Sequence, residues 1–155
     1  MCRIHYEDLN VEWKETLKYC FRTSDRFSLI TRILSKKKGN AVYAHDKALT
    51  ALEPFLIERK VGVKSWPGTI TKGTDYVMDL YHARKYRKNV TDLPNFFAPN
   101  ESGQPEDICF YRNGTVWLAT VSHEQIAFAS NLTKEDKAFF DSMGVRYDER
   151  MNDGF

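Results

Sequence analysis

Hydrophobic residues in the first third of the chain recur mainly at intervals of three and four, the spacing of one face of an α-helix. The pattern predicts a first helix over residues 10–21. A second helix is predicted between Ser24 and Gly39, because Ser24 resembles an N-cap and glycine commonly ends a helix. A third is predicted from Tyr43 to Pro54, since the residue before a proline avoids helical geometry.

The middle of the chain carries weaker signals. Residues 55–64 and 76–81 contain short apolar patterns that fit either a strand or a helix, and both alternatives stay open. The segment Trp66-Pro67-Gly68-Thr69 indicates a turn. A helical pattern over residues 84–93 precedes residues 94–105, which contain three prolines and are expected to form the longest loop.

Three strands are predicted in the last third of the chain, over Asp107–Arg112, Thr115–Val121 and Gln125–Ala129. The first two are joined by Asn113-Gly114, a strong hairpin signal because a type I′ turn needs positive φ at both central positions. We expect His123-Glu124 to join the second and third strands in the same way.

These two turns predict a register for the three strands. Phe110 is expected opposite Trp117, and Ile126 opposite Val121. One face of the sheet would then be entirely apolar, with Ile108, Phe110, Trp117, Ala119, Val121, Ile126 and Phe128. The other face would be mixed, with Asp107, Cys109, Tyr111, Leu118, Thr120 and Ser122.

The predicted fold class is α+β, in a single domain over residues 1–155. N-terminal helices over about 10–93 are expected to pack on a small antiparallel sheet, the C-terminal three-stranded meander. The loop 94–105 would separate this helical part from the meander and a C-terminal helix, which together cover residues 106–145. That last helix is predicted to begin after Thr133 and to end at Gly144.

Charge is distributed unevenly along the chain. Residues 1–91 hold 18 Lys and Arg against 10 Asp and Glu, a balance of +8, whereas residues 92–155 hold 5 against 11, a balance of −6. The basic half contains two dense runs, Lys36–Lys38 and Arg84–Lys88. This asymmetry predicts an anionic partner or a contact between oppositely charged halves of two copies, although solvated basic surfaces would give the same pattern.

Cysteine and histidine spacing indicates neither disulfides nor a metal site, and we expect no cofactor. The three cysteines are far apart and form no C-x-x-C pair, and none of the four histidines has the H-x-x-x-H spacing of a helical metal site. The start of the chain has no apolar signal region and no stretch of 18 apolar residues occurs, so a cytoplasmic location without membrane insertion is predicted.

Candidate chemistry centres on the second turn of the meander. The predicted register places Glu106 near His123, and a carboxylate there could poise the imidazole near neutrality. A structural hydrogen bond that locks the turn is the alternative. The pairing argues against Cys109 as a nucleophile, because Cys109 and Asp107 are expected on the face opposite His123.

A ligand pocket is the second interpretation of these residues. An aromatic ring on the Pro-Gly turn could stack on a planar group, while a few polar atoms would fix its orientation. The predicted ligand-binding residues are Trp66, Thr69, Glu106 and His123, with Arg84 and Arg87 as outer charges.

Three short motifs, at residues 66–69, 105–111 and 122–124, resemble those of small proteins of Firmicutes and their phages. Some of these proteins carry the label stage III sporulation protein AH. The similarity covers roughly residues 10–145. It implies a bacterial or phage origin and a soluble cytoplasmic fold, and it assigns no functional residue.

The leading functional prediction is a non-enzymatic binding protein. It would capture an anionic small molecule such as a nucleotide, or a protein partner, through its basic half. In a phage, such a protein could interfere with host defence. A hydrolase or nuclease that uses His123 with Glu106 is the first alternative. A nucleic-acid-binding protein is the second, because a tyrosine lies among the cations of Arg84–Lys88.

Overall fold

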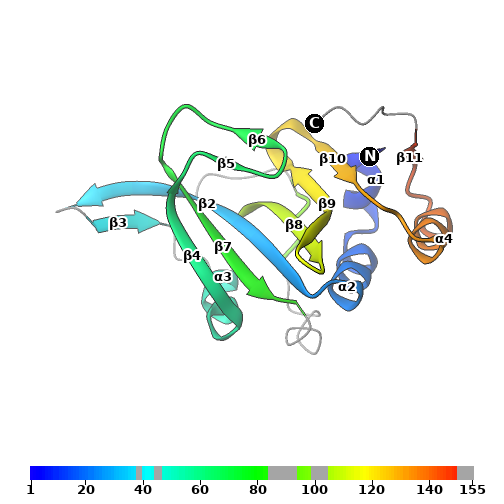
Figure 1. The fold of residues 1–155 in the computed structure, drawn as a ribbon, viewed down its shortest axis with the longest axis horizontal. Helices are drawn as coiled ribbons and strands as arrows, with labels where there is room; N and C mark the ends of the chain where they lie inside the picture. Colours follow the sequence, from blue (N-terminus) through cyan, green and yellow to red (C-terminus); the bar gives the residue numbers. More distant parts are fainter. Residues whose placement is uncertain (38–39, 44–46, 84–93, 99–104, 150–155) are drawn as a thin grey trace.

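A large antiparallel β-sheet dominates the computed structural model (Figure 1). The structure describes residues 1–37, 40–43, 47–83, 94–98 and 105–149. Eight strands follow one another across the sheet in the order β11-β1-β10-β9-β8-β2-β7-β4, and β3 pairs with β2. The strands are β1 Cys2–Ile4, β2 Arg26–Lys37, β3 Asn40–Tyr43, β4 Leu56–Val63, β7 Tyr76–His82, β8 Glu106–Arg112, β9 Thr115–Val121, β10 Ile126–Ala129 and β11 Tyr147–Asp148. A separate two-stranded hairpin consists of β5 Ser65–Trp66 and β6 Thr69–Ile70.

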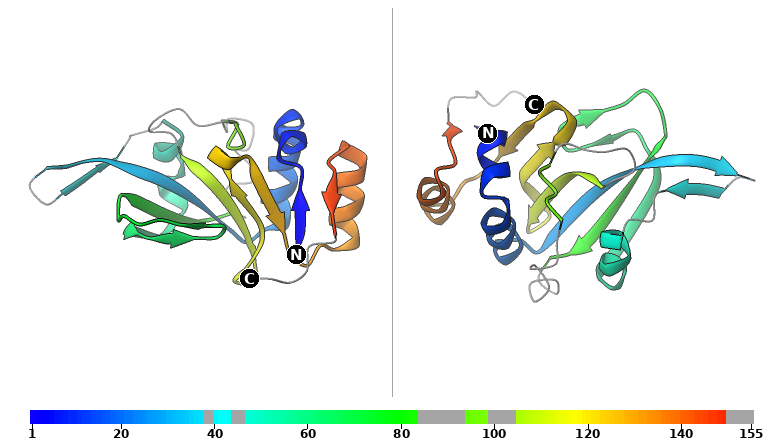
Figure 2. Two further views of the ribbon diagram at one scale, coloured as in Figure 1. Left: turned by 90° about the horizontal axis from the view of Figure 1, so that it is seen from above. Right: turned by 180° about the vertical axis from the view of Figure 1, so that it is seen from behind.

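The helices are short and lie around this sheet. They are α1 Tyr6–Val11, α2 Trp13–Thr23, α3 Lys47–Leu52 and α4 Lys134–Met143, with 3-10 turns η1 Glu53–Phe55 and η3 Ser122–Glu124. Among the described residues, none of the helices has the length and apolar character needed to cross a membrane. Figure 2 shows α1, α2 and α4 gathered at the end of the sheet that carries β1 and β11.

The prediction of a helical first half packed on a small sheet is therefore wrong. The segment predicted as the second helix forms β2, the 12-residue strand at the middle of the sheet. All five residues of Phe27–Thr31 are buried, because β2 has strands on both sides and side chains packed over both faces. A strand buried on both faces need not alternate apolar and polar residues, and in β2 the apolar residues at 27, 30, 33 and 34 have the spacing of a helix face.

The two ambiguous segments are both strands, β4 and β7. The helix predicted over 10–21 is present as α2. Only the end of the third predicted helix is helical within the described residues, as α3, and Pro54 lies in the 3-10 turn that follows. The predicted helix over 84–93, with Arg84 and Arg87, lies outside the described residues.

Helix α2 packs its apolar face onto the centre of the sheet. Phe21 lies edge-to-face against Phe27 of β2 and Phe110 of β8, with ring centroids 4.8 and 5.2 Å apart. All three rings are fully buried. Aromatic pairs of this kind stabilise by about 0.5–1.5 kcal/mol beyond the area that they bury. They hold the N-terminal helices against β8, the strand on which the candidate site begins.

The register predicted for β9 and β10 is correct. The register predicted for β8 and β9 is correct for only the two residue pairs next to the turn. Asn113 and Gly114 have φ of 50° and 77°, and Arg112 pairs with Thr115 as expected. A register shift then places Phe110 opposite Leu118 instead of Trp117. A β-bulge of this kind inserts one residue into one strand, and an alternating pattern alone does not reveal it. The β9–β10 register is confirmed, with Ile126 opposite Val121.

The predicted apolar face is consequently divided between the two sides of the sheet. Ile108, Phe110 and Trp117 belong to the main core, where Leu118 joins them. Ala119 pairs with Cys109 and Phe128, so these residues share the opposite face. The expectation that Trp117, Ala119 and Phe128 lie together is wrong, because the bulge shifts the β8–β9 pairing by one residue.

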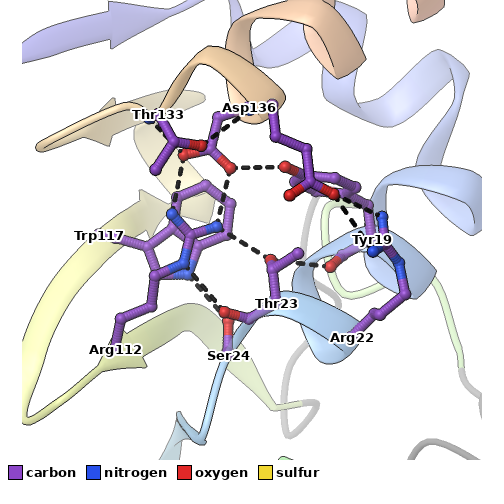
Figure 3. Close-up of polar contacts among 9 residues, drawn as sticks. Tyr19, Arg22, Thr23, Ser24, Arg112, Trp117, Thr133 and Asp136 are labelled. Atoms are coloured by element: carbon purple, nitrogen blue, oxygen red, sulfur yellow. Dashed lines mark hydrogen bonds and ion pairs between the residues drawn. The ribbon is translucent and has the colours of Figure 1, made fainter.

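A buried ion pair links α2, β8 and α4 (Figure 3). The Arg112 guanidinium donates two hydrogen bonds of 2.8 Å to Asp136, and the Tyr19 hydroxyl donates a third of 2.6 Å to the same carboxylate. Arg112 also lies 3.7 Å from the centroid of the Trp117 ring. Burial opposes ionisation of Asp136, but hydrogen bonds from Arg112, Tyr19 and the Thr133 N–H lower its pKa to about 2.

The predicted cap and stop of the last helix are confirmed. Thr133 accepts a hydrogen bond from the Asp136 N–H, and the Asp136 carboxylate accepts one from the Thr133 N–H, which makes a capping box. Gly144 ends α4 with φ of 70°. Asp136 therefore caps the helix and forms the ion pair with Arg112.

Candidate functional site

The candidate site begins at a distorted point of β8. Asp107 has φ of 53°, in the left-handed region that residues other than glycine rarely adopt. The pairing of β2 with β8 shifts at the same point, since Ser28 pairs with Cys109 while Ile30 pairs with Glu106. The surrounding structure must hold such a conformation in place, and strained residues cluster at functional sites. The distortion brings Asp107 to the β9–β10 connection, contrary to the expectation that it faces away.

The Asp107 carboxylate is buried and held at both oxygens. Oδ2 accepts a hydrogen bond of 2.8 Å from Trp66 Nε1, and Oδ1 accepts one of 2.7 Å from the Ser122 backbone N–H. The Asp107 N–H in turn donates to Ser122 Oγ at 3.1 Å. Neither donor to the carboxylate carries a formal charge. The two hydrogen bonds therefore fix the orientation of the carboxylate.

Glu106, Asp107 and His123 come together at this point. One ligand atom from each lies within 4.8 Å of those from the other two. Asp107 is fully buried, Glu106 is half-buried and the His123 side chain is 55% exposed, so the group opens from the interior towards solvent. The predicted proximity of Glu106 and His123 is present in the structure.

The turn that carries His123 has a defined backbone. Residues Ser122–Glu124 form η3, and the Gln125 N–H donates to the Ser122 carbonyl at 3.2 Å. Gln125 follows in the left-handed conformation, with φ of 54°. His123 Nε2 lies 3.7 Å from the Glu124 carboxylate. The prediction of a two-residue turn is therefore wrong, because four residues, Ser122–Gln125, connect the strands and position the imidazole, but β10 follows in the expected register.

The β5–β6 hairpin packs over the sheet beside this group. Trp66 is 7% exposed and contacts the Tyr76 ring, with centroids 4.9 Å apart. At Gly68, φ is 85°, and an added Cβ would lie 2.9 Å from the Val121 side chain. Only glycine fits there without displacing Val121. The close approach of hairpin and sheet lets the indole N–H reach Asp107.

The predicted ligand-binding residues differ in where the structure places them. Glu106 and His123 meet, whereas Trp66 is buried and uses its N–H on Asp107, so it is a supporting residue instead of an exposed stacking platform. Thr69 pairs with Trp66 on the hairpin, and its Oγ1 is buried without a hydrogen-bond partner among the described residues. Arg84 and Arg87 lie outside the described residues.

Sequence reasoning missed Asp107 as a member of the group. The strict alternation of a regular strand assigns Asp107 to the face opposite His123, and only the bulge reverses this. The adjacent acids Glu106-Asp107 at the start of a strand are the one signal that could have indicated it. Cys109 is fully buried, and burial raises the pKa of its thiol to about 12, so it stays protonated at neutral pH.

The donor set fits a divalent cation. Two carboxylates and one imidazole are ligands that Zn²⁺ and Mn²⁺ accept, and three protein ligands leave positions open for water or another ligand. Ligating carboxylates in proteins are themselves hydrogen-bonded by outer groups, as Trp66 and Ser122 do for Asp107. The histidine spacing did not predict this set, because its members come from two separate connections of the chain.

A pocket of about 670 Å³ lies elsewhere, at the end of α4 and along β11. Its lining includes Asp141, Asp148 and Glu149 together with Arg146. Arg146 is already engaged, since its guanidinium donates to Asp8 at 2.9 Å. The described lining contains none of the predicted site residues.

Comparison with protein-family models, curated proteins and solved structures finds no match for this chain. The resemblance to proteins labelled stage III sporulation protein AH stays a prediction. Function must be inferred from the site itself.

Proposed function

We propose that the chain binds a divalent cation at Glu106, Asp107 and His123, and through this cation captures a phosphate-bearing ligand. The observation that carries the proposal is the approach of the three ligand atoms to within 4.8 Å of one another. The leading sequence prediction, a non-enzymatic protein that binds an anionic small molecule, is kept in this form.

The cation resolves a conflict in the sequence prediction. Glu106 and Asp107 carry negative charge, so the bare group repels an anion. A bound cation reverses the local charge and offers open coordination positions to phosphate oxygens. Because His123 is exposed at the rim, a ligand can approach the cation from solvent.

The hairpin supports both parts of this proposal. Trp66 orients the Asp107 carboxylate, as an outer-shell donor does in known metal sites. Buried polar atoms almost always find a hydrogen-bond partner, so the Thr69 hydroxyl on the same hairpin is a candidate contact for a bound ligand.

Isothermal titration calorimetry with Mn²⁺ tests the proposal, followed by titration of AMP with and without Mn²⁺. We expect the wild type to bind one Mn²⁺ per chain, and AMP to bind only when Mn²⁺ is present. His123→Ala and Glu106→Gln should each weaken Mn²⁺ binding by more than about 10-fold. The matched control is Glu15→Gln, which removes an exposed carboxylate from α2 and should leave binding unchanged. Wild-type protein without Mn²⁺ binding would refute the proposal.

Hydrolysis at the same group is a second candidate, favoured by the proximity of the exposed His123 to Glu106. When no cation is bound there, an imidazole beside a carboxylate can act as a general base towards water. His123→Ala should then abolish turnover of a phosphate ester with little change in melting temperature. Loss of stability without any turnover in the wild type would exclude this role.

The proposed location is the cytoplasm of a bacterium or of a phage-infected cell, where interference with host defence would be one use of such a protein. All three cysteines are free and buried, which agrees with a reducing compartment. Cell fractionation with an epitope-tagged chain would test this location.

A further inference from the structure

A buried tyrosine lies beside the chain connection that carries His123. Tyr6 is the first residue of α1 and is 3% exposed. Strand β1 pairs with β10, with Ile4 opposite Ala127. Because antiparallel partners advance in opposite directions, Tyr6, two residues after Ile4, falls at the level of Gln125, where the connection ends. The fold therefore brings Tyr6 to the back of the candidate cation site.

The Tyr6 hydroxyl is held by the segment 94–98. It donates a hydrogen bond of 2.6 Å to the Phe97 carbonyl, and the two rings lie edge-to-face with centroids 6.4 Å apart. A carbonyl has no hydrogen to give, so the one hydrogen of the tyrosine hydroxyl is directed at Phe97. Burial raises the pKa of Tyr6 to about 12, so this hydrogen stays in place at neutral pH.

Ser122 connects this tyrosine to Asp107. The Ser122 hydroxyl forms a hydrogen bond with the Tyr6 hydroxyl. Since the hydrogen of Tyr6 is used on Phe97, Ser122 must be the donor in this bond. The lone pairs of Ser122 Oγ then remain for the Asp107 N–H, which donates at 3.1 Å. The hydrogen bonds all point the same way, from the Asp107 N–H through the two hydroxyls to the Phe97 carbonyl.

This arrangement supports the strained backbone of Asp107. Its φ is 53°, and the pairing of β2 with β8 shifts at this point. A buried N–H almost always needs a partner, and Ser122 Oγ is the acceptor here. If the Tyr6 hydroxyl were removed, the hydroxyl hydrogen of Ser122 would be free to turn towards the Asp107 carboxylate. It would then compete with a cation for the lone pairs of that carboxylate.

We propose that Tyr6 is a positioning residue of the cation site and that it acts through the Ser122 hydroxyl. This inference rests on the proposed function, because the orientation of Asp107 affects a ligand only if Asp107 helps to hold the cation.

Calorimetric titration with Mn²⁺ tests the inference on the wild type, Tyr6→Phe, Ser122→Ala and the double variant. The matched control is Tyr19→Phe, which removes the hydroxyl of a similarly buried tyrosine that donates to Asp136. Circular dichroism at the titration temperature checks that each variant is folded.

Tyr6→Phe should weaken Mn²⁺ binding by about 5-fold. Ser122→Ala should weaken it by roughly 10–100-fold, because Ser122 contacts Asp107 directly and Tyr6 is one hydrogen bond further away. The double variant should bind like Ser122→Ala, since the hydroxyl through which Tyr6 acts is then missing. Tyr19→Phe should bind like the wild type, although it also loses a buried hydrogen bond.

Three results would overturn the inference while the proposed function stands, provided that the wild type binds Mn²⁺. They are wild-type affinity in Tyr6→Phe, single effects that multiply in the double variant, and equal weakening by Tyr19→Phe. If the wild type binds no Mn²⁺, the proposed function fails and the role of Tyr6 fails with it.

A second measurement applies if a variant does not fold. Fluorotyrosine in place of Tyr6 keeps the hydroxyl, and fluorine nuclear magnetic resonance follows it while Zn²⁺ is added. Coupling between two sites is reciprocal, so Zn²⁺ binding should shift this resonance and leave that of fluorotyrosine in place of Tyr19 unchanged. An unmoved resonance at the Tyr6 position under saturating Zn²⁺ would also overturn the inference.

Discussion

Substitution of Asp136 by asparagine tests the buried ion pair that fastens α4 to α2 and β8. The change keeps the shape of the side chain but removes the negative charge that Arg112 and Tyr19 contact. The Asp136 side chain is 1% exposed and that of Arg112 is 22% exposed. Removing one partner of a buried pair costs about 3–5 kcal/mol, and we expect about 3 kcal/mol here because Arg112 keeps partial contact with water.

The lowered pKa of Asp136 gives a second value for the contribution of this ion pair to stability. It falls from 3.8 to about 2 on folding, so ionised Asp136 contributes about 2 kcal/mol to the free energy of unfolding at neutral pH. Because the folded pKa is the lower one, this contribution is complete above about pH 5. It is lost as the pH falls through 4 towards 2. Either contribution is a large fraction of the 5–15 kcal/mol that separates the folded and unfolded states of a typical domain.

Urea unfolding at pH 7 and at pH 3, followed by circular dichroism, measures both effects. Asp136→Asn should lower the free energy of unfolding at pH 7 by about 3 kcal/mol. It should also lose less stability than the wild type between pH 7 and pH 3. The control is Glu135→Gln, whose exposed pair with Arg22 should contribute less than about 1 kcal/mol. Equal midpoints for the two variants, or an unchanged pH dependence in Asp136→Asn, would refute the role given to this ion pair.

Three further predictions concern the site and its support. Gly68→Ala should destabilise the protein by about 1–3 kcal/mol in urea unfolding, because the new methyl group would lie 2.9 Å from Val121 and φ is positive; wild-type stability would contradict the packing described here. Trp66→Phe should weaken Mn²⁺ binding by about 10–100-fold in calorimetry through loss of the hydrogen bond to Asp107, and unaltered affinity would remove Trp66 from the site. The Cys109 thiol should react with a thiol reagent only after unfolding, since it is buried and its pKa is raised to about 12; rapid labelling of Cys109 in the native protein, identified by mass spectrometry, would contradict this.

Local sequence signals predict the structure correctly where only a few residue types satisfy a backbone requirement. Asn113-Gly114 predicted a hairpin because few other pairs accept positive φ at both positions. Thr133 and Gly144 predicted the ends of α4 for similar reasons, one through its hydroxyl and the other through its missing Cβ. These signals act within a few residues and do not depend on the rest of the fold.

Tertiary context decided the elements that the sequence did not reveal. Residues Phe27–Thr31 of β2 are buried in succession because the strand has other strands on both sides, and this depends on partners far away in the chain. The register shift near Trp117 moved the apolar face, and the bulge at Asp107 turned a carboxylate towards His123. An alternating pattern of apolar and polar residues does not reveal the extra residue of a β-bulge. The pair Glu106 and His123 could be predicted, whereas the third member of the group could not.

Anomalous X-ray diffraction from crystals grown with Mn²⁺ tests most directly whether Glu106, Asp107 and His123 hold a cation. We expect one strong anomalous peak between the three side chains, with metal–oxygen distances of about 2.2 Å. Crystals that contain Mn²⁺ but show no peak at this group, or show it only at another part of the surface, would contradict the proposed cation site.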